Sequence, residues 1–206
     1  MIDCQCPKCR CETGELIKNG GFEVRSSEPN FPFQYWEEVF FDFARVANEP
    51  ALTNIAYEGL SAARFNSLTT VAEEDKSVTL QQTVTVTPGC IYKLSFAENL
   101  LTKGNGVATA IPILTARVIY IDNFGNAVDL IIVPIIKLSA NNDPDRGYVF
   151  HEATANVPVP CDVSRLIVCF DYFENSTTGS SWLLDGVSLR AVCPTSACCQ
   201  CNEPCK

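Results

Sequence analysis

The sequence predicts an all-β protein, a β-sandwich of the jelly-roll type with a short Cys-rich tail at each end. Apolar and polar residues alternate along much of the central chain, as in strands with one face in a core and one in solvent. Turn signals separate these runs, which is typical of sandwiches and jelly rolls. Of the 12 cysteines among 206 residues, four lie in residues 1–14 and five in residues 193–206. We therefore expect a crosslinking N-terminal tail at 1–14, a jelly-roll domain at 15–192 and a C-terminal tail at 193–206.

Each expected strand follows from an alternating or apolar run. In residues 78–87, valine and leucine take one parity and threonine and glutamine the other, and Pro88-Gly89 ends the run. The segment 123–126, Asn-Phe-Gly-Asn, predicts a hairpin turn, and Pro134 in the run after it indicates an edge strand or a bulge. The expected strands are 78–87, 91–97, 117–122, 127–138, 148–157, 165–173 and 182–192, and helical turns are expected only within 33–47.

The composition excludes several classes of protein. Apolar residues make up 47% of the chain and charged residues 19%, which argues against a disordered chain. The net charge is −9 and no run of Lys or Arg occurs, so we expect neither a nucleic acid nor an anionic membrane as a partner. The longest apolar stretch, 127–138, is interrupted by charged residues and proline and is too short to cross a bilayer.

The cysteines predict disulfide chemistry. Cys198 and Cys199 are adjacent and need separate partners, and the three cysteines between the tails are an odd number, so full oxidation requires a body cysteine to pair with a tail or another chain. The alternatives are crosslinks between subunits, tails stapled locally on a monomer, and a thiolate metal cluster. Cys169 lies mid-strand and is the weaker candidate for a bridge. The expected intersubunit or structural disulfide residues are Cys4, Cys6, Cys9, Cys11, Cys90, Cys161, Cys193, Cys198, Cys199, Cys201 and Cys205.

So many cysteines indicate an oxidising final location. The start of the chain, Met1-Ile2-Asp3-Cys4, has neither the basic nor the apolar region of a signal peptide. Either a signal was removed, or the protein is made in a cytosol and oxidised when that cell lyses, as bacterial endospore surface proteins are. We expect an extracellular location on the endospore surface, reached without a signal peptide.

Three motifs resemble the family 4/9 carbohydrate-binding modules. They are the opening segment Leu16 to Glu23, the segment Val78 to Phe96, which is similar to the central hairpin of the family, and the closing strand Trp182 to Leu189. The resemblance covers roughly residues 15–191 and implies a galactose-binding-like jelly roll, a fold that is reused for many functions. The Cys-rich tails are foreign to that family and look more like those of bacterial spore coat and appendage proteins.

The resemblance also implies a structural Ca²⁺ held by Glu23 and Asp185, with backbone carbonyls around Gly20 and Gly21. Asp185 shares the parity of the apolar residues of its strand, and a buried carboxylate is costly unless it is paired or bound to a metal. The family pattern has a second acidic residue where this chain has Gly186, so a hydrogen-bonded Asp185 with an exposed Glu23 is the alternative. No other cofactor is expected.

Sugar-binding modules stack an exposed aromatic ring on a pyranose. Tyr35, Trp36 and Trp182 are the candidates here, and the alternative is that such aromatics fill the core. His151 is the only histidine, and no Gly-x-Ser-x-Gly motif is present, so we do not expect an enzyme.

These observations together predict the structural subunit of a disulfide-crosslinked fibre or coat on the bacterial endospore surface. It would self-assemble into a homopolymer through its tails, with other spore-surface proteins as further partners. The alternative is a carbohydrate-binding module, a surface lectin-like protein that does not form a polymer.

Overall fold

The structure is a computed structural model. It describes residues 11, 13–28, 31–42, 44–50, 55–67, 75–102, 105–106, 112–136, 147–174, 177–178 and 180–192. Tail cysteines other than Cys11 therefore lie outside the described residues. None of the described segments is a helix long and apolar enough to cross a membrane.

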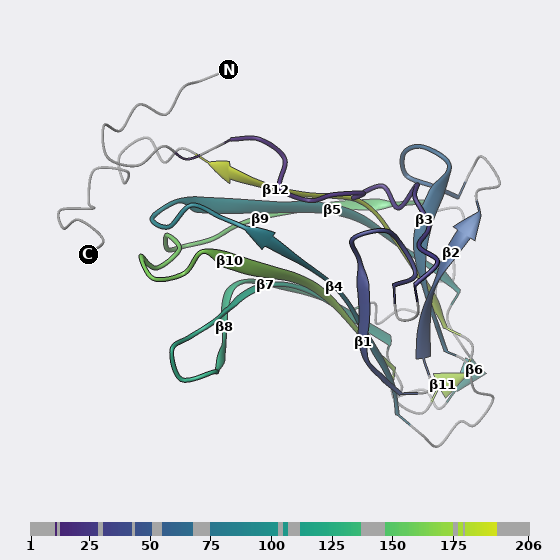
Figure 1. The fold of residues 1–206 in the computed structure, drawn as a ribbon. Helices are drawn as coiled ribbons and strands as arrows, with labels where there is room; N and C mark the ends of the chain where they lie inside the picture. The colour runs from purple at the N-terminus through teal and green to yellow at the C-terminus, as the bar shows by residue number, and fades with distance from the viewer. Residues whose placement is uncertain are drawn as a thin grey trace.

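Two five-stranded antiparallel sheets pack face to face (Figure 1). Sheet 1 has the order β1 (Glu37–Asp42), β4 (Lys76–Thr85), β10 (Arg165–Glu174), β7 (Pro112–Ile121), β8 (Ala127–Ile136). Sheet 2 has the order β2 (Ala44–Pro50), β3 (Ser61–Ser67), β12 (Ser181–Val192), β5 (Ile91–Thr102), β9 (Val149–Thr154). The short strands β6 (Asn105–Gly106) and β11 (Thr177–Thr178) pair with each other. The prediction of an all-β sandwich is confirmed.

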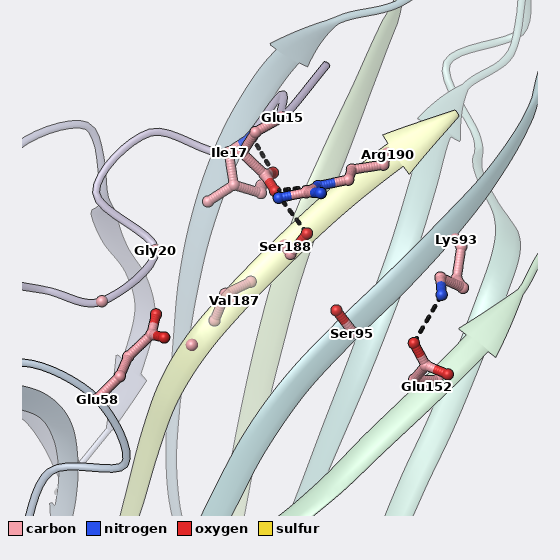
Figure 2. A pocket seen from close by; sticks show the side chains of 12 residues that line it. Glu15, Ile17, Gly20, Glu58, Lys93, Ser95, Glu152, Val187, Ser188 and Arg190 are labelled. Atoms are coloured by element: carbon pink, nitrogen blue, oxygen red, sulfur yellow. Dashed lines mark hydrogen bonds and ion pairs between the residues drawn. The ribbon is translucent and has the colours of Figure 1, made fainter. Parts of the chain in front are cut away.

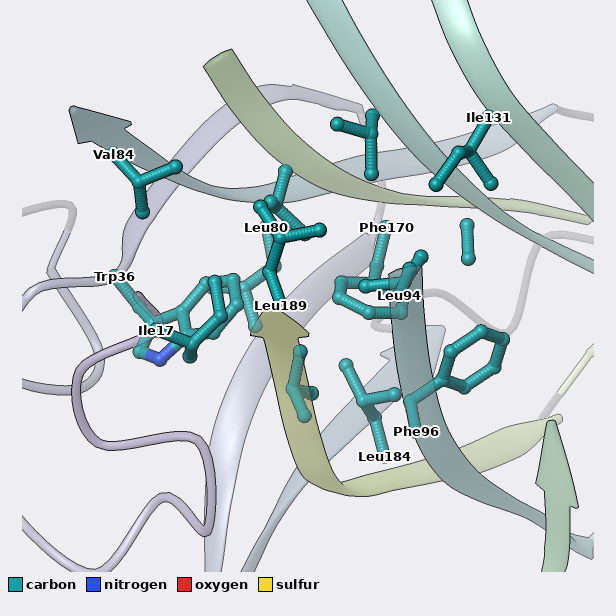
Figure 3. Packing of buried hydrophobic residues seen from close by; sticks show 14 of the residues in the cluster. Ile17, Trp36, Leu80, Val84, Leu94, Phe96, Ile131, Phe170, Leu184 and Leu189 are labelled. Atoms are coloured by element: carbon teal, nitrogen blue, oxygen red, sulfur yellow. The ribbon is translucent and has the colours of Figure 1, made fainter. Parts of the chain in front are cut away.

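The core lies between the two sheets (Figure 3). Leu80 and Phe170 of sheet 1 pack with Leu94 and Phe96 of sheet 2, and the rings of Phe96 and Phe170 meet edge to face at 5.3 Å. Trp36 belongs to the same buried cluster. This burial of apolar surface from both sheets stabilises the sandwich.

Several expected elements are confirmed and others are corrected. The expected helical turns within 33–47 are wrong, because most of that segment belongs to strands β1 and β2. The 123–126 turn joins β7 to β8, and β8, which contains Pro134, is an edge strand as expected. The segment 78–96 is not a hairpin, since β4 and β5 lie in different sheets.

A bulge in β12 overturns the parity argument for that strand. The pairing of β12 with β5 shifts register between Asp185 and Ser188, where Gly186 has φ of 58°. Trp182 belongs to the core cluster, and so does Val187 on the far side of the bulge, although one residue number is even and the other odd. Asp185 is buried as expected. It directly follows Leu184 of that cluster, so its side chain lies on the opposite face of the strand, where it accepts hydrogen bonds from the N–H groups of residues 57 and 58.

Candidate functional site

Two carboxylates hold the turn at residues 55–61 against sheet 2. Asp185 Oδ2 accepts hydrogen bonds from the backbone N–H groups of residues 57 and 58, at 2.8 and 3.1 Å. Glu23 Oε1 accepts hydrogen bonds from the N–H groups of residues 60 and 61, at 2.7 and 3.0 Å. The turn therefore has its backbone donors satisfied by side chains from two distant parts of the chain.

Burial dominates the chemistry of Asp185. It raises the pKa of the Asp185 carboxyl to about 7, although three backbone N–H hydrogen bonds favour the ionised form and lower the pKa. The negative charge of Glu58 nearby raises it further. The opening segment lies against the same strand: a Cβ added at Gly20 would come within 2.0 Å of the Val187 carbonyl oxygen, so only glycine fits there.

The predicted calcium site has part of its donor set in place. Glu23, Glu58 and Asp185 all have side-chain atoms within 4 Å of the position that a Cβ at Gly21 would occupy. Within the described ranges, however, no group of three or more Asp, Glu, His or Cys side chains is arranged as a metal site. The oxygen of Gly20 already accepts a hydrogen bond from the Val187 N–H. Calcium at Glu23 and Asp185 thus stays a prediction. Backbone hydrogen bonds account for the buried Asp185 carboxylate without a metal, and Glu23 is exposed, as in the alternative interpretation.

The prediction of an exposed ring for sugar stacking is wrong for two of the three candidate residues. Trp36 and Trp182 are both fully buried. The Trp36 indole packs against Phe22 at 5.3 Å and donates a hydrogen bond to the carbonyl of Asn19. The Trp182 indole donates to Glu98 at 2.5 Å. Both rings have the core-filling role that was the alternative.

Tyr35 is the expected platform that remains. The residue is 48% exposed, and the Lys18 ammonium lies 5.1 Å from its ring centroid, a cation–π contact. Its φ of 74° places a bulky residue in the left-handed region, where such residues are rarely found. Strain of this kind is kept only where the surrounding structure imposes it, and it concentrates at functional sites.

Two cavities, one of them lined by Tyr35, adjoin at Thr83, and we call them together the sheet 1 groove. The first, of about 390 Å³, is lined by Tyr35, Lys18 and the Gln82–Thr85 end of β4. The second, of about 380 Å³, is lined by Asn123, Asp162 and Arg165, among others. Thr83 lines both cavities, so they adjoin across the end of sheet 1.

Polar side chains continue from this groove along the outer face of sheet 1. Thr79 donates to Asp171 at 2.6 Å, and Arg117 bridges Asp171 and Asp129 at 3.4 and 2.8 Å. The outward residues of four neighbouring strands, β4, β10, β7 and β8, are thus linked in a row. Such an ordered polar face can offer hydrogen-bond donors and acceptors to a ligand without rearrangement.

Another cavity, of about 500 Å³, lies on the outer face of sheet 2, and we call it the sheet 2 groove (Figure 2). The Lys93–Glu152 ion pair, at 2.7 Å, lies on one side of it and the Arg190–Glu15 ion pair, at 3.0 Å, on the other. Ser95 lies between them on β5. The sequence reasoning missed this groove, because its residues come from five separated segments.

The described cysteines differ in whether they form a disulfide. Cys11 is bonded to Cys90, with the two Cα atoms 5.8 Å apart, and both are buried. A tail cysteine is therefore anchored to the jelly-roll domain. Cys161 is also disulfide-bonded. Of the described cysteines, Cys169 alone is free; burial raises the pKa of its thiol to about 12.

His151 has a structural setting. Its ring stacks on Phe96 at 5.1 Å, and its Nε2 lies 3.2 Å from the Glu98 carboxylate that also accepts the Trp182 indole hydrogen bond. The imidazole thus helps to satisfy a fully buried carboxylate.

No protein-family model and no curated protein sequence matches the chain. Solved structures do match its fold. TmCBM61, solved in complex with β-1,4-galactotriose, has a TM-score of 0.55 at 18% identity and covers 87% of this chain and 99% of its own. The CBM22-1 xylan-binding domain of Paenibacillus barcinonensis Xyn10C has a TM-score of 0.52 at 15% identity, covering 89% of this chain and 97% of its own.

The chain has the β-sandwich fold of these carbohydrate-binding modules. At such low identity the likeness concerns the fold alone. A third match, the arabinose-bound MgGH51 α-L-arabinofuranosidase, has a TM-score of 0.53 at 15% identity; this chain corresponds to 26% of that enzyme.

Proposed function

We propose that this protein is a carbohydrate-binding module whose glycan lies in the sheet 1 groove. The observation that carries the proposal is the exposed, backbone-strained Tyr35 at the mouth of that groove. An aromatic face beside polar side chains is the combination that a sugar needs, because a pyranose has an apolar face and a rim of hydroxyl groups.

The residues that line the two cavities would have different roles in binding a glycan. Tyr35 offers its ring to one sugar residue at the first cavity. Thr83, shared by both cavities, and Arg165 and Asn123 in the second offer hydrogen bonds to the hydroxyl groups of the next residues. A chain of more than one sugar therefore fits better than a monosaccharide.

The fold neighbours supply the first ligands to test. One was solved with β-1,4-galactotriose and another is named as a xylan-binding domain. We therefore propose β-1,4-galactan and xylan oligosaccharides as the starting set. Cellulo- and chito-oligosaccharides extend it to other β-linked glycans.

Calorimetric titration of Tyr35 variants tests the site. Tyr35→Ala removes the ring and should weaken binding at least about tenfold, as truncation of an aromatic anchor does, whereas Tyr35→Phe keeps the ring and should bind nearly as the wild type does. Tyr35→Gly should lose binding without a lower melting temperature, because glycine relieves the left-handed strain. Unchanged affinity in Tyr35→Ala would show that the glycan does not lie here.

The disulfide-crosslinked fibre or coat of the endospore surface is the second candidate function. The Cys11–Cys90 bond favours it in one respect, since it fastens the start of the chain covalently to the sandwich, so that force on a crosslinked tail would pass directly into the domain. The same bond lies within one chain and removes two cysteines from the pool for intersubunit bonds. Electrophoresis with and without reductant tests it: a ladder that collapses on reduction supports the polymer, and a monomer in both lanes contradicts it.

A further inference from the structure

We propose that the outer face of sheet 2 carries a second saccharide site, built from an aromatic shelf and the sheet 2 groove, that takes a neutral sugar. The aromatic shelf is Tyr57, Tyr148 and Phe150. The shelf residues line neither cavity of the sheet 1 groove, although Glu15 lines both grooves, so variants of the shelf test this site separately from the function proposed there.

The aromatic shelf is exposed and yet ordered. Tyr57 and Phe150 stack with their ring centroids 6.3 Å apart and their planes 18° apart, and Tyr148 packs at 5.6 Å from Tyr57. Nearly half of each of Tyr57 and Phe150 is accessible, at 47% and 49%. Exposed aromatic rings that are fixed against each other lose little conformational entropy when a ligand covers them.

The backbone below Tyr57 explains how the shelf is held. The buried Asp185 carboxylate accepts the Tyr57 N–H at 2.8 Å, which fixes the turn over β12. A Cβ added at Gly186 would lie 3.2 Å from Tyr57 Cδ1, so the ring lies close over the glycine of the β12 bulge. The turn, the bulge and the buried carboxylate thus place one tyrosine ring at the edge of the groove.

The aromatic shelf and the polar groove are continuous. Glu58 and Gly186 line the groove, and they adjoin Tyr57 in sequence and in space respectively. On β9, Glu152 follows Phe150 by two residues and therefore lies on the same face of the strand. A sugar ring that stacks on the aromatic shelf can therefore direct its hydroxyl groups into the groove. The volume of about 500 Å³ is within the range of small-ligand sites.

The charges of the groove select a neutral sugar. Lys93 pairs with Glu152 and Arg190 pairs with Glu15, so both cations are compensated. Among the described residues these pairs leave the Glu58 carboxylate without a cation. A uronate or a sulfated sugar would meet an uncompensated negative charge, on a protein whose net charge is −9.

Sites on the outer faces of both sheets would make the module bivalent. The two sites face outward from different sheets, so one molecule that binds a separate glycan at each can join two polysaccharide chains. Crosslinking of a soluble polysaccharide is thus a consequence that neither site produces alone.

The test uses the whole chain and two separate variants of the shelf. Phe150→Thr replaces an exposed residue of an edge strand with a β-branched one, which leaves β9 intact. Tyr57→Ala removes the second ring while keeping the backbone N–H that Asp185 binds. Phe124→Thr, at the 90% exposed tip of the β7–β8 turn, is the matched control. Binding of neutral and uronic-acid oligosaccharides is followed by calorimetry, polysaccharide crosslinking by turbidity, and folding by the melting temperature.

We expect the wild type to bind two neutral oligosaccharides and both shelf variants to bind one, with the turbidity lost and the melting temperature kept. Phe124→Thr should behave as the wild type does. Wild-type stoichiometry in both shelf variants would overturn the second site, and equal affinity for uronic-acid glycans would overturn its selectivity. Loss of binding only in Tyr35→Ala would support the first site and overturn this one, whereas loss only in the shelf variants would do the reverse.

Discussion

Replacing Cys11 and Cys90 together by alanine should lower the free energy of unfolding by about 4.5 kcal/mol. The bond joins residues separated by 79 positions. In the chain-entropy treatment, closing a loop of this length removes about 15 cal/mol/K from the unfolded chain, which gives about 4.5 kcal/mol at 25 °C. For a chain of about 200 residues this corresponds to a fall in melting temperature of about 9–18 °C.

The assay is urea and thermal unfolding of the oxidised wild type and the Cys11→Ala/Cys90→Ala variant. The matched control is Cys169→Ala, which removes a buried cysteine that carries no bridge and should cost far less. Deleting residues 1–11 should reproduce the loss seen in the double variant, whereas deleting residues 1–10 should leave the bond and its stabilisation in place. A melting temperature of the double variant within about 2 °C of the wild type would refute the reasoning, because the bridge would then add almost nothing.

Four further predictions concern buried groups and the expected calcium site. The pKa of Asp185 is about 7 in the folded state and lies above its ordinary 3.8. Its contribution to the free energy of unfolding is therefore full below pH 4 and is lost as the pH rises through 7. Urea titrations at several pH values should show a smaller dependence of this free energy on pH in Asp185→Asn. If calcium binds Glu23 and Asp185, the melting temperature at pH 8 should fall with chelator in the wild type and not in Asp185→Asn. The Cys169 thiol, with its pKa raised to about 12, should resist iodoacetamide at pH 8 until denaturant is added, and rapid native alkylation would contradict its burial. Trp182→Phe removes a hydrogen bond to the buried Glu98 and should cost about 1–3 kcal/mol in urea unfolding; an unchanged midpoint would show that the bond contributes nothing net.

The sequence by itself determined the all-β class and the turn between β7 and β8. Alternation has a period of two in a strand whatever it pairs with, so Val78 to Val86 could be assigned before any partner was known. Pro134 indicated an edge strand or a bulge, because proline has no N–H for a second ladder, and β8 lies at the edge of its sheet. The sheet to which each strand belongs was not determined, and the expected 78–96 hairpin failed for that reason.

Only the tertiary structure decided which aromatic rings meet solvent. The bulge at Gly186 breaks the parity of β12, so counting residues along the strand could not place Trp182 or Asp185. Tyr148 and Phe150 are two residues apart, so the alternation of a strand could have predicted that they lie on one face. Their partner Tyr57, however, comes from a turn about 90 residues earlier. A binding surface of this kind depends on how distant segments pack, and a local sequence pattern carries no information about that packing.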